Sequence, residues 1–224
     1  MGRFDPMPGA DLHPVPPVNQ KQIDKIRLIL KREKRTWYRV YTASNDPLFY
    51  GNAGYRFDSF AGLFGTLYIS AQPEGAFIET FGRTLGMKLL PQSKLNKKAI
   101  AVLKTDTLNL IDITGRGAPI AGLDGRISTD TNYDGLTRPW ADALYKHKLR
   151  ADGILFRARH DLDQIVAAIF DRAKDKIRIQ ETIGFASRKG MIFLRPIVDS
   201  YKYAIIDDTS RTRSKREIRR KQSQ

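Results

Sequence analysis

The segment from Gly54 to Arg83 constrains the fold of this 224-residue chain more than any other stretch. Its run Thr66-Leu67-Tyr68-Ile69-Ser70 is rich in β-branched and aromatic residues, which is typical of a strand. Pro73 follows closely and suits the first turn of a helix, where the negative charge of Glu74 is also favoured. The segment is therefore expected to form a glycine-flanked loop, a short strand and a proline-started helix, in that order.

The predicted helix carries one carboxylate that stands apart from its apolar side. The apolar residues recur at the helical period and form one side of the helix: Phe77, Ile78, Phe81 and Leu85. Glu79 lies roughly 145° from the centre of this side, at about 100° per residue. The helix is expected to pack through its phenylalanines and to leave Glu79 pointing away from them. By itself this position is that of a solvated glutamate, so a function for Glu79 needs further support.

Two arginines lie in segments that allow contact with a ligand. Arg56 follows Gly54 in a loop, where the backbone can come close to a bound molecule. Arg39 lies in a predicted strand, residues 37–42, and shares a face with the aromatic side chains of Trp37 and Tyr41. The same pattern also fits a half-buried arginine on the protein surface. The strand pattern alone therefore does not decide between a ligand-binding and a surface role for Arg39.

The remaining elements predict an α+β domain with a compact mixed sheet of short strands and few helices. Strands are expected at 87–91, 99–104, 107–113, 153–157 and 166–170, with weaker ones at 178–183, 191–194 and 203–206. Helices are expected at 21–34 and 137–147, the second capped by Thr137 with Pro139 in its first turn. Residues 115–133 are expected to form a long loop with a short helical piece.

The net charge of +15 is concentrated at the two ends of the chain. Residues 209–224 carry a net +6 and residues 21–35 a net +5. Only these basic termini are therefore candidates for contact with nucleic acid. Their charge is equally consistent with a solvated helix face and a solubilising tail. The expected organisation is a proline-rich irregular arm at 1–19, one domain at 20–207 whose first helix is basic, and a basic tail at 208–224.

The composition excludes several classes of protein and site. The chain has no cysteine, so disulfides, thiolate catalysis and cysteine metal sites are excluded. No apolar run approaches the ~20 residues that span a bilayer, and the N-terminal residues lack the apolar core of a secretory signal. A cytoplasmic protein without membrane contact is expected. The histidines lack metal-ligand spacing, so no metal site is expected, and His160 is at most a structural neighbour of a site.

The residues that remain suit cleavage of a nicotinamide dinucleotide at its glycosidic bond, with NAD as substrate and no cofactor. They are Glu79, Arg39 and Tyr68 as catalytic candidates, and Arg56, Tyr41 and Arg159 as substrate-binding candidates. Guanidinium groups bind a diphosphate in bidentate fashion, and a tyrosine ring can stack on nicotinamide. Breaking the ribose–nicotinamide bond builds positive charge on the sugar, which a fixed carboxylate stabilises.

Five segments in the same order resemble the RES-domain family, over about residues 35–175. They are Trp37-Tyr38-Arg39-Val40, the segment 54–83, Leu110-Ile111-Asp112-Ile113-Thr114, Trp140-Ala141-Asp142-Ala143-Leu144, and Asp152–His160 followed by Ile169-Phe170-Asp171. The resemblance implies a fold similar to ADP-ribosyltransferases and the activity of a toxin that degrades NAD. It also implies a partner antitoxin of the Xre helix-turn-helix type.

The resemblance assigns roles to individual residues of this chain. Arg39 matches the family arginine, Glu79 the family glutamate, and Tyr68 the tyrosine of the strand before the glutamate helix. Arg56 lies where the family has a glycine-arginine-phenylalanine turn, although Tyr55 replaces the usual glycine.

Ala158 departs from the family pattern, because it replaces the usual serine in front of an arginine. Loss of one hydrogen bond is worth ~1 kcal/mol, so a weakened activity is expected. The alternative is a RES-fold module that binds a nucleotide, a protein or nucleic acid without turnover. For an active enzyme, the sequence leaves water, phosphate and a protein side chain open as acceptors of ADP-ribose.

Overall fold

The computed structural model describes residues 18–83, 86 and 88–208. The expected arm up to residue 17, the basic tail from residue 209 and Leu85 on the apolar side of the predicted helix lie outside these residues. The strands are β1 Leu30–Glu33, β2 Thr36–Thr42, β3 Thr66–Ser70, β4 Leu89–Pro91, β5 Lys98–Thr105, β6 Leu108–Asp112, β7 Gly153–Arg157, β8 Ile165–Phe170, β9 Ile177–Gly184 and β10 Ala204–Ile206. The helices are α1 Gln20–Ile23, α2 Pro73–Phe81, α3 Gln92–Leu95, α4 Gly117–Ile120, α5 Arg126–Thr129, η1 Tyr133–Thr137, α6 Arg138–Lys146, η2 Asp171–Lys176 and α7 Arg188–Ser200.

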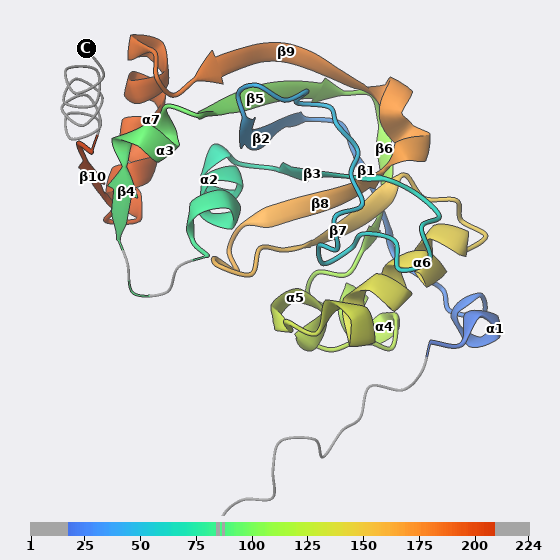
Figure 1. Cartoon of the computed structure of the whole chain (residues 1–224). Coiled ribbons are helices and arrows are strands. Elements are labelled where there is room, and N and C mark those ends of the chain that lie inside the picture. Colours follow the sequence, from blue (N-terminus) through green and yellow to red (C-terminus); the bar gives the residue numbers. More distant parts are fainter. Residues whose placement is uncertain (1–17, 84–85, 87, 209–224) are drawn as a thin grey trace, which may run out of the picture.

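Within the described ranges, eight strands form one curled sheet in the order β1-β6-β7-β8-β3-β2-β5-β9, and β10 pairs with β4 in a small separate sheet (Figure 1). Most neighbouring strands are antiparallel, whereas β6 and β7 run parallel. Strands β2 and β5 pair along seven residues, but β2 and β3 pair only where Tyr38 faces Ser70. The sheet therefore opens between β2 and β3, and this divergence positions the site.

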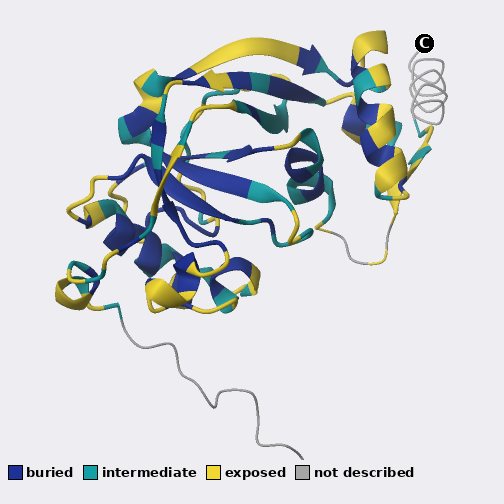
Figure 2. Cartoon of the chain, turned by 180° about the vertical axis from the view of Figure 1, so that it is seen from behind, coloured by how far each residue is buried: buried dark blue, intermediate teal, exposed yellow. Residues whose placement is uncertain are grey.

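Helices cover both faces of the curled sheet. Helix α6 packs on one side through Trp140 and Leu144, in a core cluster with residues of β7 and β8. Helices α2 and α7 pack on β2 and β5 through a second cluster, in which Phe77 and Leu194 are buried. Figure 2 shows the central strands buried and the outer edge strand β9 exposed along most of its length. Among the described residues, no helix is long and apolar enough to cross a membrane.

The segment 66–81 forms the predicted strand and helix. Strand β3 has the expected bounds, and α2 begins at Pro73 with Phe77 and Ile78 buried. The helix packs closely on β3 at Gly75. A Cβ atom at this position would lie 2.3 Å from the Ser70 hydroxyl oxygen, so only glycine fits without a shift. The fold class is α+β, as predicted.

Two predicted elements are wrong. Residues 21–34 were expected to form one helix, but α1 ends at Ile23 and residues 30–33 form β1, which pairs with β6. The backbone of this edge strand gains hydrogen bonds from β6, and this pairing outweighs the local helical pattern. Residues 191–194 were expected to form a strand but lie inside α7, whose cap Ser187 accepts a hydrogen bond from the Gly190 amide. Pro196 lies inside that helix, and because proline usually breaks helices it obscures the helical pattern of this segment.

Candidate active site

A cleft of about 1390 Å³ opens where β2 separates from β3. Its walls are formed by β2, the loop before β3, helix α2 and the residues that follow β7. All six predicted site residues line it: Arg39, Tyr41, Arg56, Tyr68, Glu79 and Arg159. The structure thus brings together side chains that lie up to 120 positions apart in the sequence.

Glu79 lies near the end of α2, half-buried in the wall of the cleft. Its Oε1 accepts hydrogen bonds from the backbone amides of Arg159 at 2.8 Å and His160 at 3.4 Å. Two backbone donors on one carboxylate oxygen fix the side chain and leave its other oxygen available to a ligand. Glu79 was expected to point away from the packing face of α2, and its position in the cleft wall agrees with this expectation.

The guanidinium group of Arg56 contacts two backbone carbonyls and an aromatic ring. Arg56 is only 6% exposed, and its Nη1 donates to the backbone carbonyls of Ile127 and Asp130, each at 3.3 Å. The guanidinium carbon lies 5.2 Å from the ring centroid of Tyr133, which begins the π-helix η1. Burial lowers the pKa of Arg56, but an arginine remains charged at any physiological pH.

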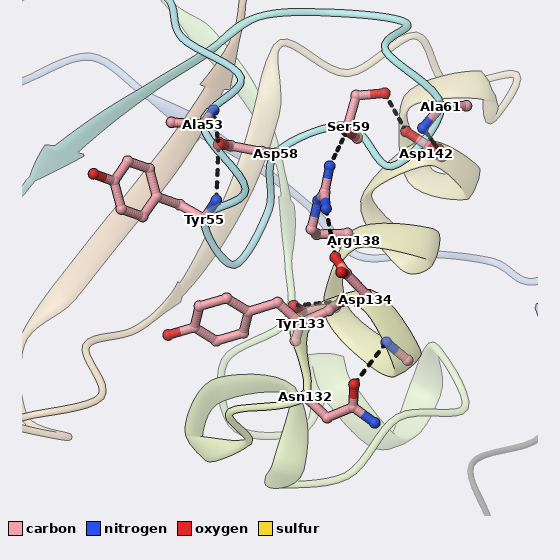
Figure 3. Close-up of polar contacts among 12 residues, drawn as sticks. Ala53, Tyr55, Asp58, Ser59, Ala61, Asn132, Tyr133, Asp134, Arg138 and Asp142 are labelled. Atoms are coloured by element: carbon pink, nitrogen blue, oxygen red, sulfur yellow. Dashed lines mark hydrogen bonds and ion pairs between the residues drawn. The ribbon is translucent and has the colours of Figure 1, made fainter.

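The loop that carries Arg56 is anchored by a carboxylate that the sequence reading missed. Asp58 is buried, and its Oδ2 accepts from the amides of Ala53 at 2.8 Å and Tyr55 at 2.9 Å (Figure 3). Its Oδ1 accepts a hydrogen bond from the Tyr68 hydroxyl at 2.9 Å. The sequence did contain a signal, because aspartate often closes a turn by accepting from nearby backbone amides.

The hydroxyl group of Tyr68 is hydrogen-bonded within the protein. It donates to Asp58 and accepts from the amide of Phe57 at 2.8 Å, so both functions of the group are used. Burial and the nearby Asp58 raise the pKa of this hydroxyl well above its usual value, which keeps it protonated. The ring meets Tyr55 edge-on with centroids 6.3 Å apart. Tyr68 therefore connects β3 to the Arg56 loop, and only its ring is left for a ligand.

Several hydrogen bonds join the same loop to helix α6. The Ser59 hydroxyl donates to Asp142 at 2.6 Å, and the Ala61 amide donates to the other oxygen of this carboxylate at 2.9 Å. Arg138 donates to the Ser59 carbonyl at 2.8 Å and forms an ion pair with Asp134 (Figure 3). These bonds hold the loop at both ends, so the cleft wall is built before a ligand arrives.

Arg39 lines the cleft from strand β2. Its Nη1 donates to the Phe49 carbonyl at 3.3 Å. Burial lowers its pKa, while the charges of Asp46 and Tyr50 act in the opposite direction. The charges that act on Arg56 come instead from Tyr133 and Glu79, among others. The two guanidinium groups thus have different charged neighbours within the same cleft.

Ala158 is fully buried and is not part of the cleft wall. It belongs to the apolar cluster that includes Phe57 and Phe156. Its amide donates to the Gln164 carbonyl at 3.0 Å, which closes the turn after β7. The structure thus places the alanine beneath the cleft, whereas Arg159 beside it lines the cleft.

Over residues 18–83, 86 and 88–208, no group of three or more His, Asp or Glu side chains is placed to hold a metal ion. The described wall of the cleft contains the fixed carboxylate of Glu79, several guanidinium groups and aromatic rings.

A comparison with protein families matches residues 36–188 to the RES domain. This match spans more than half of the chain, so the protein belongs to the RES-domain family. A search of curated proteins finds no match. Among solved structures, a chain from the crystal structure of the M. tuberculosis MbcT–MbcA toxin–antitoxin complex is similar, with 17% identity and a TM-score of 0.53 over 73% of this chain and 90% of that chain. At this identity the likeness concerns the fold, and it confirms the α+β class.

Proposed function

We propose that this protein is a RES-type toxin that cleaves NAD at the bond between nicotinamide and ribose. The observation that carries the proposal is the fixed Glu79 carboxylate in a cleft that also contains Arg39, Arg56 and Arg159. Membership of the RES-domain family and the fold shared with a chain of a toxin–antitoxin complex support it.

The proposed reaction begins with an extended dinucleotide in the cleft. The C1′–N bond breaks, and its electron pair moves to the nicotinamide nitrogen, which leaves as a neutral group. Positive charge develops on the ribose, and Glu79 stabilises it because the carboxylate is already oriented by the Arg159 amide. Water, phosphate or a protein side chain then attacks C1′, forms the new bond and loses its proton to solvent, which completes the transfer. One carboxylate is sufficient, since the leaving group needs no proton.

The arginines are proposed to bind the diphosphate. Guanidinium groups match phosphate oxygens in bidentate fashion, and each such charged contact is worth roughly 1.5–3 kcal/mol. Arg56 has Nη1 bonded to protein carbonyls, which leaves its other nitrogens for the ligand. A nucleotide-binding module without turnover is the competing function. The burial of Ala158 favours the enzyme, because the missing serine hydroxyl removes no group from the cleft wall.

As a toxin, the protein is proposed to bind an antitoxin of the Xre type that covers the cleft, and to act in the cytoplasm. The supporting observation is the shared fold with a chain from a toxin–antitoxin complex. The partner's contacts are expected at the cleft mouth, where Phe49 and Tyr55 are exposed.

The test is nicotinamide release from NAD by the purified protein, beside Glu79→Ala and Glu74→Ala. Glu74 lies on the same helix but outside the cleft wall, so its variant controls for loss of a carboxylate from α2. Release by the wild type and Glu74→Ala but not by Glu79→Ala supports the enzyme, and its dependence on added phosphate identifies the acceptor. Equal release by both variants excludes the assigned role of Glu79.

A further inference from the structure

Within the described residues, the hydrogen bonds and the ring contact of the Arg56 guanidinium group all come from one later segment of the chain. Its Nη1 donates to the backbone carbonyls of Ile127 and Asp130, each at 3.3 Å, and its carbon lies 5.2 Å from the ring centroid of Tyr133. A cation within about 6 Å of an aromatic centroid is attracted by the face of the ring. We name these two carbonyls and this ring the arginine socket.

The arginine socket leaves one edge of the guanidinium group open. Nη1 is used by the two carbonyls, whereas no group in the described ranges accepts a hydrogen bond from Nε or Nη2 of Arg56. Neither nitrogen belongs to the buried side-chain atoms that lack a partner, so both are reached by solvent in the cleft. The N–H groups of this edge lie in parallel and match two phosphate oxygens. A ligand is therefore expected to approach the Nε and Nη2 edge.

No carboxylate occupies this edge at the distance of an ion pair. The charge of Glu79 acts on Arg56, but among the described residues no ion pair includes Arg56. Burial is the larger influence and lowers the pKa of the guanidinium group, which nevertheless stays charged. The orientation of the group therefore depends on the arginine socket.

The ring of Tyr133 is held in place by the turn around it. The Asp130 carboxylate accepts from the Asn132 amide at 2.7 Å, and the Asn132 side-chain oxygen accepts from the Gly135 amide at 2.9 Å. A Cβ at Gly135 would lie 2.3 Å from the Asn132 side-chain nitrogen, so a side chain there would displace this cap. The rings of Tyr133 and Tyr55 point to the same side, and both residues line the cleft (Figure 3). Single π-helical turns, such as the one that Tyr133 begins, are frequent at functional sites.

We infer that Tyr133 is a positioning residue, which fixes the plane of the Arg56 guanidinium group so that its Nε and Nη2 edge binds the diphosphate of the dinucleotide in bidentate fashion. This inference rests on the proposed function, in which the arginines hold the diphosphate. Bonds from Nη1 alone leave the guanidinium group able to tilt, and the face of the ring removes this freedom. A ligand then binds without first ordering the arginine side chain, which would cost conformational entropy.

The first experiment measures by calorimetry the binding of ADP-ribose, which contains the diphosphate but no nicotinamide. Tyr133→Leu is expected to weaken binding about tenfold, as for the loss of one partly desolvated cation–π contact, whereas Tyr133→Phe keeps the ring and stays within about twofold. Tyr145→Leu is the matched control, because the Tyr145 ring lies 3.6 Å from the Arg172 guanidinium carbon and neither residue lines the cleft. This control is expected to lose stability but to bind ADP-ribose as the wild type does.

A double-mutant cycle tests whether Tyr133 acts through Arg56. In the Arg56→Met background, Tyr133→Leu is expected to change the affinity for ADP-ribose by less than about twofold, because no guanidinium group remains to be oriented. A tenfold loss in that background as well would show that Tyr133 contacts the ligand directly, and it overturns the inference. Wild-type affinity in Tyr133→Leu alone also overturns it, a result that does not require the Arg56 variant to fold.

The kinetics of nicotinamide release separate this inference from the proposed reaction. Diphosphate contacts are made equally in the ground state and the transition state, so Tyr133→Leu is expected to raise KM for NAD about tenfold and to leave kcat within about twofold. A fall in kcat with an unchanged KM overturns the inference. If ADP-ribose binding depends on Tyr133 as expected but no nicotinamide is released, the inference holds and only the proposed reaction fails. If the wild type does not bind ADP-ribose, the inference is wrong, even where NAD is cleaved.

Discussion

The carboxylate of Glu79 accepts a hydrogen bond from the backbone amide of Arg159 across 2.8 Å, and this bond joins α2 to the turn after β7. Within the described part of the chain, both hydrogen-bond donors to Glu79 are main-chain amides, those of Arg159 and His160. Because backbone donors persist when nearby side chains change, the charge of Glu79 can be removed without removing its bond.

Glu79→Gln is expected to separate charge from position. The amide oxygen of glutamine can still accept from the Arg159 amide, so we expect the free energy of unfolding in urea to fall by no more than about 1 kcal/mol. Loss of the negative charge is expected to lower kcat for nicotinamide release by about 10²–10³, as for other groups that stabilise developing charge. Glu74→Gln on the same helix is the control. Full activity in Glu79→Gln would show that the charge has no role in the reaction.

Tyr68→Phe is expected to destabilise the loop that carries Arg56. The change leaves the buried Asp58 without one donor and the Phe57 amide without its acceptor. An unsatisfied buried polar group costs about 1–3 kcal/mol, which urea unfolding measures.

Tyr41→Phe is the control for that measurement, because no described group forms a hydrogen bond with the Tyr41 hydroxyl, although its ring also lines the cleft. We expect its free energy of unfolding to stay within about 0.5 kcal/mol of the wild type. If both tyrosine variants unfold at the same urea concentration as the wild type, the Tyr68 bonds do not hold the loop.

Local sequence signals predicted the elements that depend on neighbouring residues. Strand β3, strand β7 and the start of α2 at Pro73 agree with the sequence reading, since their residue types and proline position act within a few residues. Strand β1 did not, because it is defined by its pairing with β6, more than 70 residues away. No local pattern contains that partner.

For the candidate site, too, the sequence predicted some features and missed others. The sequence and the family resemblance identified six of the side chains that line the cleft, but they did not predict how those side chains are held. Asp58 and Tyr133 were missed, because their roles depend on contacts with other segments of the chain.

Gly153→Ala is expected to weaken the centre of the sheet. A Cβ at this position would lie 2.4 Å from the carbonyl oxygen of Ala168 on the neighbouring strand β8, so backbone must move. Overpacking of this kind costs about 1–3 kcal/mol of the free energy of unfolding. Gly125→Ala is the control, because nothing lies within 4 Å of its Cβ and its φ is −58°. Equal urea midpoints for the two variants would contradict this account.

His160 is expected to make the stability of the protein depend on pH. Burial lowers its pKa below the usual 6.5, and the opposing charge of Glu79 does not reverse this. The other contributions come from the cations around it, which also lower the pKa: Arg159, Arg83 and Arg56. Below about pH 6.5 the unfolded chain therefore binds a proton more readily than the folded protein does, and stability falls as the pH falls.

The measurement is the free energy of unfolding as a function of pH for the wild type and for His160→Gln. The glutamine does not titrate, so the variant is expected to lose less stability than the wild type as the pH falls below about 6.5, while the difference between the two is constant above that value. Comparing the two curves cancels the carboxylates and the other histidines, which titrate in both proteins. Parallel curves over the whole range would show that His160 titrates equally in the folded and unfolded chains.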